Sequence, residues 1–415
     1  MRICLTTIGS DGDVQPYLAL GKRLLAAGHD VRLAAVARYA ARSAAVGVPF
    51  VAIGRTWDDQ EMERRFAELL RIKDPMRQLV MIMEIIKDPL IEMVPELQAI
   101  LPGHDLLVGH PMALAGIVAA KISSTPFIAG HLGSLIRSRN VNPLGSNLGP
   151  FLNGLLWSVM RWMLRRHTDA LLNEVVTSAG LAPWRDILFE ANNSRLLNLL
   201  AVSPEVIPRD PLWPERYVGT GYWFLDEPSF EPDPEFAAFM DAEAPVVITF
   251  GSMGGVDAAA YTRKLADGVR GLGRRVVLQA GWAKLGEGEL PENVRRVGFV
   301  PHSWLFQRAA CVVHHGGAGT TAAALRAGVP QVVVWHMGDQ PAWGKMVQRL
   351  GVGPKPCSHL DLEAPWLAAT LAKVLADAPM AARAGEIGAR VRAEDGTGLA
   401  VALIERAMKD PPAPG

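Results

Sequence analysis

Residues 312–344 read VVHHGGAGTTAAALRAGVPQVVVWHMGDQPAWG, and this stretch decides the fold. An apolar, β-branched run leads into the glycine-rich turn 314–321, and an alanine-rich helical segment follows. Gly328 and Pro330 end that helix, and residues 331–334 have the composition of a buried parallel strand. A strand–helix–strand unit of this kind predicts an α/β domain built on a parallel sheet.

The turn 314–321 is a candidate anion site. Backbone N–H groups at the start of a helix lack intrahelical partners, and the helix dipole is positive there, so a phosphate is a favourable ligand. Asp339 and Gln340 follow the next strand, at the edge where open α/β sheets bind ligands. A phosphate-binding turn beside two side chains that can bind hydroxyls predicts a site for a sugar attached to a diphosphate.

Three segments of this stretch resemble the donor-binding signature of nucleotide-sugar-dependent glycosyltransferases with the GT-B fold. They are HHGGAGTT at 314–321, RAGVPQ at 326–331 and GDQPAWG at 338–344. The nearest groups are the sterol glucosyltransferases and the bacterial enzymes that glycosylate glycopeptide antibiotics and other lipophilic natural products. The resemblance implies an α/β protein of two Rossmann-like, doubly wound domains that face each other across a cleft, with the acceptor on the N-terminal side and the donor on the C-terminal side.

Composition excludes several classes of protein. A chain of 415 residues is long enough for two domains, and Lys+Arg and Asp+Glu are both 42, which gives no indication of a nucleic-acid partner. Cys4, Cys311 and Cys357 are scattered, which argues against disulfides and structural zinc. The start of the chain lacks the form of a signal peptide, and the longest apolar runs fall short of the roughly 20 residues that span a bilayer. We therefore expect a soluble cytoplasmic protein, a monomer or a dimer.

The alternation of strand and helix patterns predicts two domains. Residues 1–207 form the N-terminal, acceptor-binding domain, and 196–202 is predicted as its last strand. Residues 208–244 are rich in proline and lack periodicity, so they are predicted as a linker. Residues 245–390 form the predicted nucleotide-sugar-binding domain. The remaining segment, 391–415, is predicted as a helix that packs back on the N-terminal domain.

Asp13 is the candidate catalytic base. It lies in the loop after the first strand, and the transfer of a sugar to a hydroxyl needs a base for the alcohol proton, typically worth about 10²–10⁴-fold in rate. In the resembling enzymes the aspartate of GxxGDxxP has this role, and Asp13 matches it. Local sequence equally allows a helix N-cap. Asp11, Gly12 and Asp13 also form a DxD, but the nucleotide signature lies in the other half of the chain, so we expect no metal.

The resemblance places the donor on several further residues. His314 would donate to a diphosphate oxygen and ease departure of the leaving group, whereas His315 would pack or orient the loop. Trp304 matches the aromatic that stacks on the nucleotide base, with a buried core tryptophan as the alternative. Asp339 and Gln340 would contact the 3- and 4-hydroxyls of a glucose-type sugar, although Asp339 could also cap a helix. The remaining donor residues are Gly12, Gly251, Ser252, Gly316, Ala318, Gly319 and Thr320; a plain tight turn also accounts for Gly251 and Ser252.

The acceptor side is predicted from apolar and aromatic segments at 57–95 and 134–165. A stripe at helical spacing is first a core, second a wall for a flat lipophilic acceptor, and third a membrane-surface helix, because Arg161, Arg165 and Arg166 lie beside it. The candidate acceptor residues are His110, Met112, His131, Trp157 and Met160.

Together these features predict an inverting, metal-independent glycosyltransferase without a prosthetic group. It would move a hexose, glucose in the first instance, from UDP-glucose or TDP-glucose to a hydroxyl of a lipophilic acceptor such as a sterol or polyketide, with possible peripheral membrane contact. One alternative is a sugar-nucleotide 2-epimerase of the same fold, which would need further acid and base carboxylates and no acceptor site. Another is a non-catalytic sugar-nucleotide-binding homologue.

Overall fold

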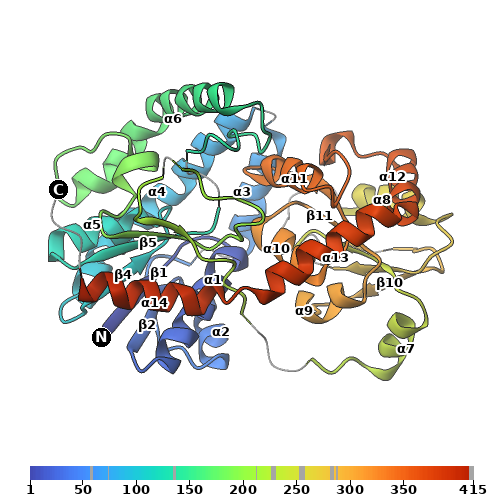
Figure 1. The fold of residues 1–415 in the computed structure, drawn as a ribbon, viewed down its shortest axis with the longest axis horizontal. Helices are drawn as coiled ribbons and strands as arrows, with labels where there is room; N and C mark the ends of the chain where they lie inside the picture. The colour runs from blue at the N-terminus through green and yellow to red at the C-terminus, as the bar shows by residue number, and fades with distance from the viewer. Residues whose placement is uncertain are drawn as a thin grey trace.

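The computed structural model describes residues 1–56, 59–72, 74–133, 137–211, 213–225, 230–251, 258–280, 285–286 and 288–410. Two parallel sheets organise these residues, one in each half of the molecule (Figure 1). The first sheet has the strand order β3-β2-β1-β4-β5-β6-β7, and the second has the order β10-β9-β8-β11-β12-β13. Both orders reverse beside their first strand, between β1 and β4 and between β8 and β11. In open α/β sheets ligands bind at such a reversal.

The N-terminal half alternates strands and helices up to the long helix α6. Its strands are β1 (Arg2–Thr6), β2 (Asp30–Ala35), β3 (Phe50–Ala52), β4 (Leu106–Gly109), β5 (Phe127–His131), β6 (Leu197–Leu200) and β7 (Tyr217–Gly219). Its helices are α1 (Asp11–Ala26), α2 (Ala40–Ala45), α3 (Asp59–Arg71), α4 (Pro75–Ile100), α5 (Leu114–Ser123) and α6 (Pro150–Ser178).

The C-terminal half repeats this pattern and ends in a run of helices. Its strands are β8 (Val246–Thr249), β9 (Val276–Gln279), β10 (Val294–Val297), β11 (Cys311–His314), β12 (Gln331–Trp335) and β13 (Cys357–Ser358). Its helices are α7 (Pro234–Ala242), α8 (Ala258–Val269), α9 (His302–Leu305), α10 (Ala318–Ala327), α11 (Gln340–Arg349), α12 (Ala364–Ala376), α13 (Ala378–Ala393) and α14 (Gly396–Lys409). None of the helices in the described ranges has the length and apolarity that a bilayer crossing requires.

Each sheet is covered by helices on both faces, which is why its strands are apolar throughout. In β1, Ile3 and Leu5 belong to one buried cluster, together with residues of α1 and α14. Cys4, between them, belongs to a second buried cluster on the opposite face, which is formed largely by α4, α5 and α6. Since side chains alternate along a strand, one short run supplies both cores. The fold is therefore the predicted pair of doubly wound α/β domains.

The segment 208–244 differs from its prediction as an unstructured linker. Residues 217–219 form β7, which pairs in parallel with β6, so residues 196–202 do not contain the last strand of the first sheet. Residues 234–242 form α7. A three-residue edge strand is too short to show periodicity in the sequence, and neighbouring prolines conceal it further.

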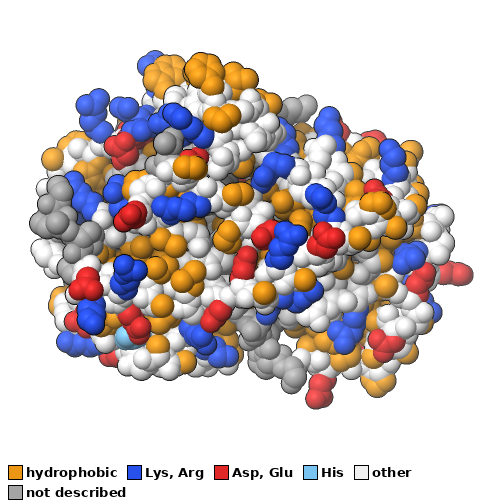
Figure 2. All heavy atoms as spheres, in the orientation of Figure 1, with side chains coloured by type: hydrophobic (Ala, Val, Ile, Leu, Met, Phe, Trp, Pro, Cys, Tyr) orange, Lys and Arg blue, Asp and Glu red, His pale blue; other side chains and the backbone are white. Residues whose placement is uncertain are grey.

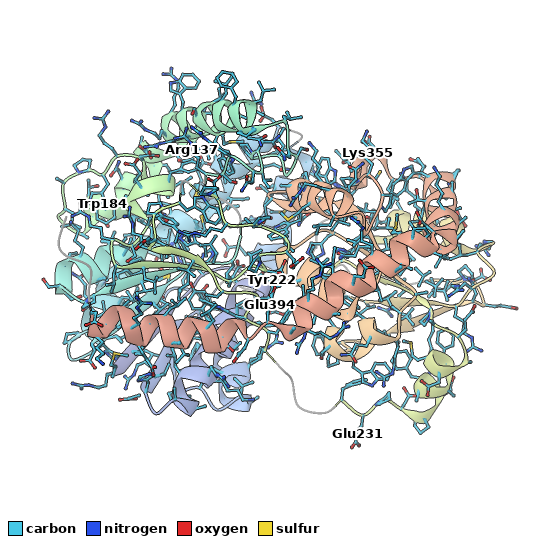
Figure 3. All side chains as sticks on the ribbon, in the orientation of Figure 1. Arg137, Trp184, Tyr222, Glu231, Lys355 and Glu394 are labelled. Carbon is cyan, nitrogen blue, oxygen red and sulfur yellow. The ribbon has the colours of Figure 1, made fainter. Side chains whose placement is uncertain are left out.

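The two halves are joined by an apolar cluster and by the C-terminal helices. Ile207 and Trp213 pack in one cluster with Trp343 and Met346 of α11 and with residues of α13. Figures 1 and 3 show α13 lying on the C-terminal half and α14 continuing onto the N-terminal half, with Glu394 near their junction.

The passage between α13 and α14 is held by polar contacts to the N-terminal half. Ser203 Oγ donates to the carboxylate of Glu394. Arg23 and Asp395 form an ion pair of 2.8 Å between α1 and the start of α14. Residues 396–409 thus pack on α1, as the sequence predicted for the end of the chain, while the exact boundaries 207, 244 and 390 stay predictions.

Candidate active site

The ligand-binding edges of the two sheets face each other. Gly12 lies in the first turn of α1, which follows β1, and Gly319 lies in the first turn of α10, which follows β11. A Cβ atom placed on Gly319 would lie 3.9 Å from Cα of Gly12. The N-termini of two helices from opposite domains therefore meet, and the positive ends of both dipoles are directed at the same region.

Asp13 is held at the start of α1 by Ser10. Its Oδ2 accepts hydrogen bonds from the Ser10 backbone N–H at 2.8 Å and from the Ser10 hydroxyl at 3.1 Å. Ser10 is the N-cap residue and Asp13 is the third helical residue, so Asp13 completes a capping interaction without being the cap itself. Oδ1 accepts no hydrogen bond from the described residues and is the oxygen available to a substrate.

The surroundings of Asp13 suit a general base. Burial among protein atoms raises its pKa from 3.8 to about 6, against the lowering effect of the Ser10 hydrogen bonds. The charges of Asp339 and Asp11 raise this pKa further. Solvent still reaches the half-buried Asp13 side chain. A carboxylate with a pKa near 6 is ionised at neutral pH and yet basic enough to share a proton with an attacking hydroxyl.

Asp339 stands on the other side of this region, at the start of α11. Its Oδ2 accepts a hydrogen bond from Trp343 Nε1 at 2.7 Å. It occupies the N-cap position, but its side chain makes no capping bond to the helix backbone. Its pKa is raised by burial among protein atoms, although solvent reaches the side chain. A carboxylate fixed by an indole and reached by solvent is available to bind hydroxyl groups.

Gln340 is used differently from its prediction. Its Oε1 accepts hydrogen bonds from the backbone N–H groups of His336 at 2.7 Å and Met337 at 3.0 Å. Both lone pairs of that oxygen are therefore occupied within the protein. In this structure Gln340 holds the turn that carries Asp339, and the predicted acceptance of a sugar hydroxyl by its side-chain oxygen has no support.

The two histidines of the glycine-rich turn also differ from their predicted roles. His314 is fully buried, its Nε2 is 2.9 Å from Oε1 of Gln331, and its Nδ1 accepts the backbone N–H of Gly316 at 3.1 Å. Burial lowers the pKa of His314 to about 4, so the ring is neutral and both nitrogens are engaged. The arrangement gives it no N–H for a diphosphate.

His315 is the histidine that reaches the open side. Its ring lies against Gly317 and against Gly251, where a Cβ atom would be 3.3 Å from its Cε1. Its Nδ1 is buried and has no hydrogen-bond partner among the described residues. The loops after β8 and β11 are the two that were predicted to bind diphosphate, and His315 lies between them. Burial lowers its pKa to about 3, so it would act as a neutral hydrogen-bonding group.

The turn itself has the backbone that a phosphate site needs. Gly316 has a φ of +84°, and a Cβ atom there would lie 2.7 Å from Val333 Cγ1, so only glycine fits. Gly317 is the N-cap of α10 and supplies no side-chain cap, which leaves the N–H groups of Ala318, Gly319 and Thr320 at an uncapped helix start. Gly251 has a φ of +55°. Ser252 lies outside the described residues.

Two predicted acceptor residues lie beneath Asp13. His110 and His131 end β4 and β5 and are buried, with pKa values lowered by burial to about 3 and about 4. Tyr17, one helical turn after Asp13, packs its ring edge-on against His110 at 6.4 Å. Nε2 of His131 is buried without a partner among the described residues, so it can receive an acceptor polar group.

The other predicted acceptor residues are further from this region or belong to the core. Met112 donates its backbone N–H to Nδ1 of His110 at 3.2 Å, and its side chain packs against the core beneath the first sheet. Trp157 is buried, its Nε1 donates to the Val141 carbonyl at 2.7 Å, and it lines an internal cavity of about 10 Å³ with Met346. That volume is about one water molecule, so Trp157 is a core residue here. Met160, on the same helix, is half-buried.

Comparison with known proteins gives the family. Residues 3–128 match the glycosyltransferase family 28 N-terminal domain, and residues 263–401 match the erythromycin biosynthesis protein CIII-like C-terminal domain. The chain is 35% identical over 424 residues to O-mycaminosyltylonolide 6-deoxyallosyltransferase of Streptomyces fradiae, which covers 98% of this chain and 97% of that protein. The chain belongs to the GT-B glycosyltransferases. It is an enzyme of this class.

Other relatives of the glycosyltransferase cover it equally well. Sterol 3-beta-glucosyltransferase of Emericella nidulans is 31% identical over 99% of this chain, but the chain spans only 30% of that protein's length. The crystal structure of the glycotransferase of kitacinnamycin matches 98% of this chain and 99% of its own, with a TM-score of 0.73 at 22% identity. A Streptomyces sp. SF2575 glycosyltransferase complexed with thymidine diphosphate matches 98% of this chain and 99% of its own, with a TM-score of 0.64 at 22% identity.

Sequence reasoning missed one aromatic residue of this glycosyltransferase. The ring of Trp304 is enclosed by Phe236 at 5.6 Å and by the guanidinium of Arg308 at 4.3 Å, which fits the core alternative. Phe299 follows β10 at the ligand-binding edge, and its side chain is 67% exposed. An aromatic with a free face at this edge suits stacking on a base. Its place one residue before Val300 was the available signal.

The donor set gives no direct indication of a metal. Within the described part of the chain there is no cluster of three or more His, Cys, Asp or Glu side chains that could hold an ion. Asp11 of the formal DxD lies within 3.5 Å of Arg42 Nη1, so a cation already neighbours it. Metal independence remains a prediction.

Proposed function

We propose that this glycosyltransferase moves a hexose from a UDP- or TDP-sugar to a hydroxyl of a lipophilic small molecule, a natural product or a sterol, with inversion at the anomeric carbon. The observation that carries the proposal is the pair formed by Asp13 and Asp339. The two carboxylates come from opposite domains and interact electrostatically, and the pKa of Asp13 is about 6. One carboxylate is thus poised to accept a proton beside another that can hold a sugar.

The donor would bind to the C-terminal half. The diphosphate would lie against the uncapped first turn of α10 and accept a hydrogen bond from His315, while Phe299 stacks on the base. The hexose would then lie toward Asp339, which can accept hydrogen bonds from two ring hydroxyls. Because such a site penalises a sugar that lacks those hydroxyls, we propose a glucose-type donor.

In the reaction, Asp13 takes the proton of the acceptor hydroxyl as its oxygen attacks the anomeric carbon. The bond from that carbon to the diphosphate oxygen breaks on the opposite face, and the electron pair leaves with the nucleoside diphosphate. The amides of α10 and the ring of His315 stabilise the charge that develops there. Asp13 then releases the proton to solvent. The configuration at the anomeric carbon is inverted by this single displacement.

The similarity to known enzymes supports the choice of acceptor class. The names of the relatives specify a macrolide intermediate and a sterol as acceptors of those proteins, and both are large and lipophilic. The same names specify a 6-deoxyallosyl group and a glucosyl group. One solved relative holds thymidine diphosphate. The sterol relatives are much longer than this chain, so their acceptor is one member of the panel to be tested.

A substrate panel tests the proposal. The purified protein would be incubated with UDP-glucose, TDP-glucose, and their 4-deoxy and 6-deoxy forms, each with macrolide, sterol and flavonoid alcohols, in the presence and absence of EDTA. We expect acceptor-dependent release of nucleoside diphosphate, unaffected by EDTA, and a β-glycoside by NMR. Conversion of the sugar nucleotide without an acceptor would point to an epimerase. A loss of activity in EDTA that Mg²⁺ restores would assign a metal role to Asp11 and Asp13.

A further inference from the structure

The first half of α6 presents apolar side chains to solvent. Phe151 is 82% exposed and Trp162 is 63% exposed, with Leu155 and Val159 between them. These positions are four, four and three residues apart, so they lie on one face of the helix. Leu144, Leu148 and Leu152 are also exposed beside them. Figure 2 shows this apolar surface along the upper edge of the molecule, over α6.

Packing of the domain does not require this face. The opposite side of the helix supplies Trp157, Leu164, Leu172 and Val176, which are buried in the domain. A surface helix normally has charged or polar residues on its outer side. A helix that is apolar on both sides therefore has a second contact to make, and a contiguous exposed apolar surface of this kind marks an interaction site.

The border of the apolar face is basic. Arg137, Arg139 and Arg166 are exposed beside it, and Arg137 reaches α6 through a contact of 3.3 Å with Ser158 Oγ. Figure 3 labels Arg137 next to α6. The acidic groups nearby are already engaged: Asp186 and Glu190 both pair with Arg161.

A further acidic group, Asp169, is also occupied, because it accepts the backbone N–H groups of Asp186 at 2.7 Å and Ile187 at 3.1 Å. It lies 4.0 Å from Arg165 as well. The charge left around the apolar face is therefore positive, which is complementary to an anionic partner.

We propose that this outer face of α6 docks on an anionic phospholipid bilayer. The helix would lie in the plane of the surface, with Phe151, Leu155, Val159 and Trp162 inserted at the boundary between headgroups and acyl chains and the arginines beside the headgroups. Phenylalanine and tryptophan at the two ends of the face suit that boundary. Figure 1 shows α6 at the outer margin of the N-terminal half, where a flat surface can reach it.

Docking would bring the lipid surface close to the acceptor side of the active site. The loop that leads into α6 contacts the C-terminal half next to the catalytic region, because a Cβ atom on Gly145 would overlap the carbonyl oxygen of Ala342. Ala342 is three residues after Asp339. This part of the inference rests on the proposed lipophilic acceptor, which would partition into the bilayer and enter from it.

Vesicle flotation tests the docking without any turnover. The full chain is mixed with vesicles of phosphatidylcholine and phosphatidylglycerol at 70:30, and with vesicles of phosphatidylcholine alone, and the bound fraction is measured at low and high salt. We expect binding to the anionic vesicles that weakens with salt. The variant Phe151→Ser/Trp162→Ser should reduce the partition coefficient about tenfold or more, since two large apolar groups no longer insert. The matched variant Leu360→Ser/Leu399→Ser, at exposed leucines elsewhere, should bind as the parent does.

Several results would overturn the proposal. Absence of binding by the parent chain to both kinds of vesicle would do so, and so would an equal loss in the matched variant. Light scattering that shows a dimer broken by Phe151→Ser/Trp162→Ser would assign the face to a second copy of the chain. Because water-soluble acceptors can be glycosylated in the absence of vesicles, turnover on them separates this proposal from the proposed function.

Discussion

Asp13 and Asp339 reach the same region from opposite domains, and the charge of Asp339 raises the pKa of Asp13. Neither residue has this environment within its own domain. Asp13 is fixed by Ser10 at the start of α1, and Asp339 is fixed by Trp343 at the start of α11. The proposed base is therefore adjusted by a residue from the donor half, so its basicity depends on how the two halves are apposed.

Replacement of Asp13 should abolish most of the turnover. Asp13→Asn keeps an oxygen that can accept from Ser10 but cannot take a proton, so kcat should fall by about 10²–10⁴-fold. Binding of UDP or TDP, measured by calorimetry, should remain unchanged because the diphosphate contacts lie on the other half. A variant with near-normal kcat would leave Asp13 with only its part in the capping interaction.

The same variant should be more stable than the parent at neutral and higher pH. The pKa of Asp13 is about 6 in the folded protein and 3.8 in the unfolded reference, so the folded state binds the proton more tightly. Ionisation of Asp13 therefore disfavours folding, fully so above about pH 6, and this cost disappears as the pH falls toward 4. We expect Asp13→Asn to raise Tm by about 1–3 °C at pH 8 and by less at pH 5. A gain that grows on acidification would contradict the raised pKa.

Replacement of Asp339 should move the acid limb of the pH profile. A negative neighbour raises the pKa of a carboxyl group, so Asp339→Asn should lower the pKa of Asp13 while the amide oxygen still accepts from Trp343. The rise of kcat/KM with pH, expected near pH 6 in the parent, should then occur at lower pH. A limb that stays in place or moves upward would show that another group controls the ionisation.

The two histidines of the turn can be distinguished by binding. His315→Ala should weaken the affinity for UDP or TDP by about tenfold or more, since a hydrogen bond to a charged group is lost, and should leave Tm nearly unchanged. Gln331→Met removes the partner of the buried His314, so it should lower Tm and leave nucleotide affinity within about twofold. If the two variants weaken nucleotide binding equally, His314 has the role that the sequence first suggested.

The fold and the two catalytic loops could be predicted because they depend on local chemistry. Gly316 must be glycine, since its φ is +84° and Val333 leaves no room for a Cβ atom. Such positions leave a mark in the sequence that does not require knowledge of distant contacts. The same holds for Asp13, whose loop lies between a strand and a helix that are both clear from their apolar spacing.

The roles that the sequence could not predict depend on which way side chains point. His314 and His315 are adjacent and identical in type, but only the register of β11 on β12 brings His314 near Gln331. Trp304 and Phe299 both lie near Val300, and only the packing of α7 shows that Trp304 is enclosed. β7 was missed because three residues carry no period.

The passage of α14 onto the N-terminal half determines how this enzyme can be recombined with others. Ala400, Val401 and Ile404 fill the same core as Leu20 and Leu24 of α1, the helix that carries Asp13. A chimera joined within residues 220–245 would therefore take its donor half from one parent together with a C-terminal helix foreign to the acceptor half. Exchange of donor specificity should succeed more often when residues 396–409 are kept from the parent that supplies residues 1–207.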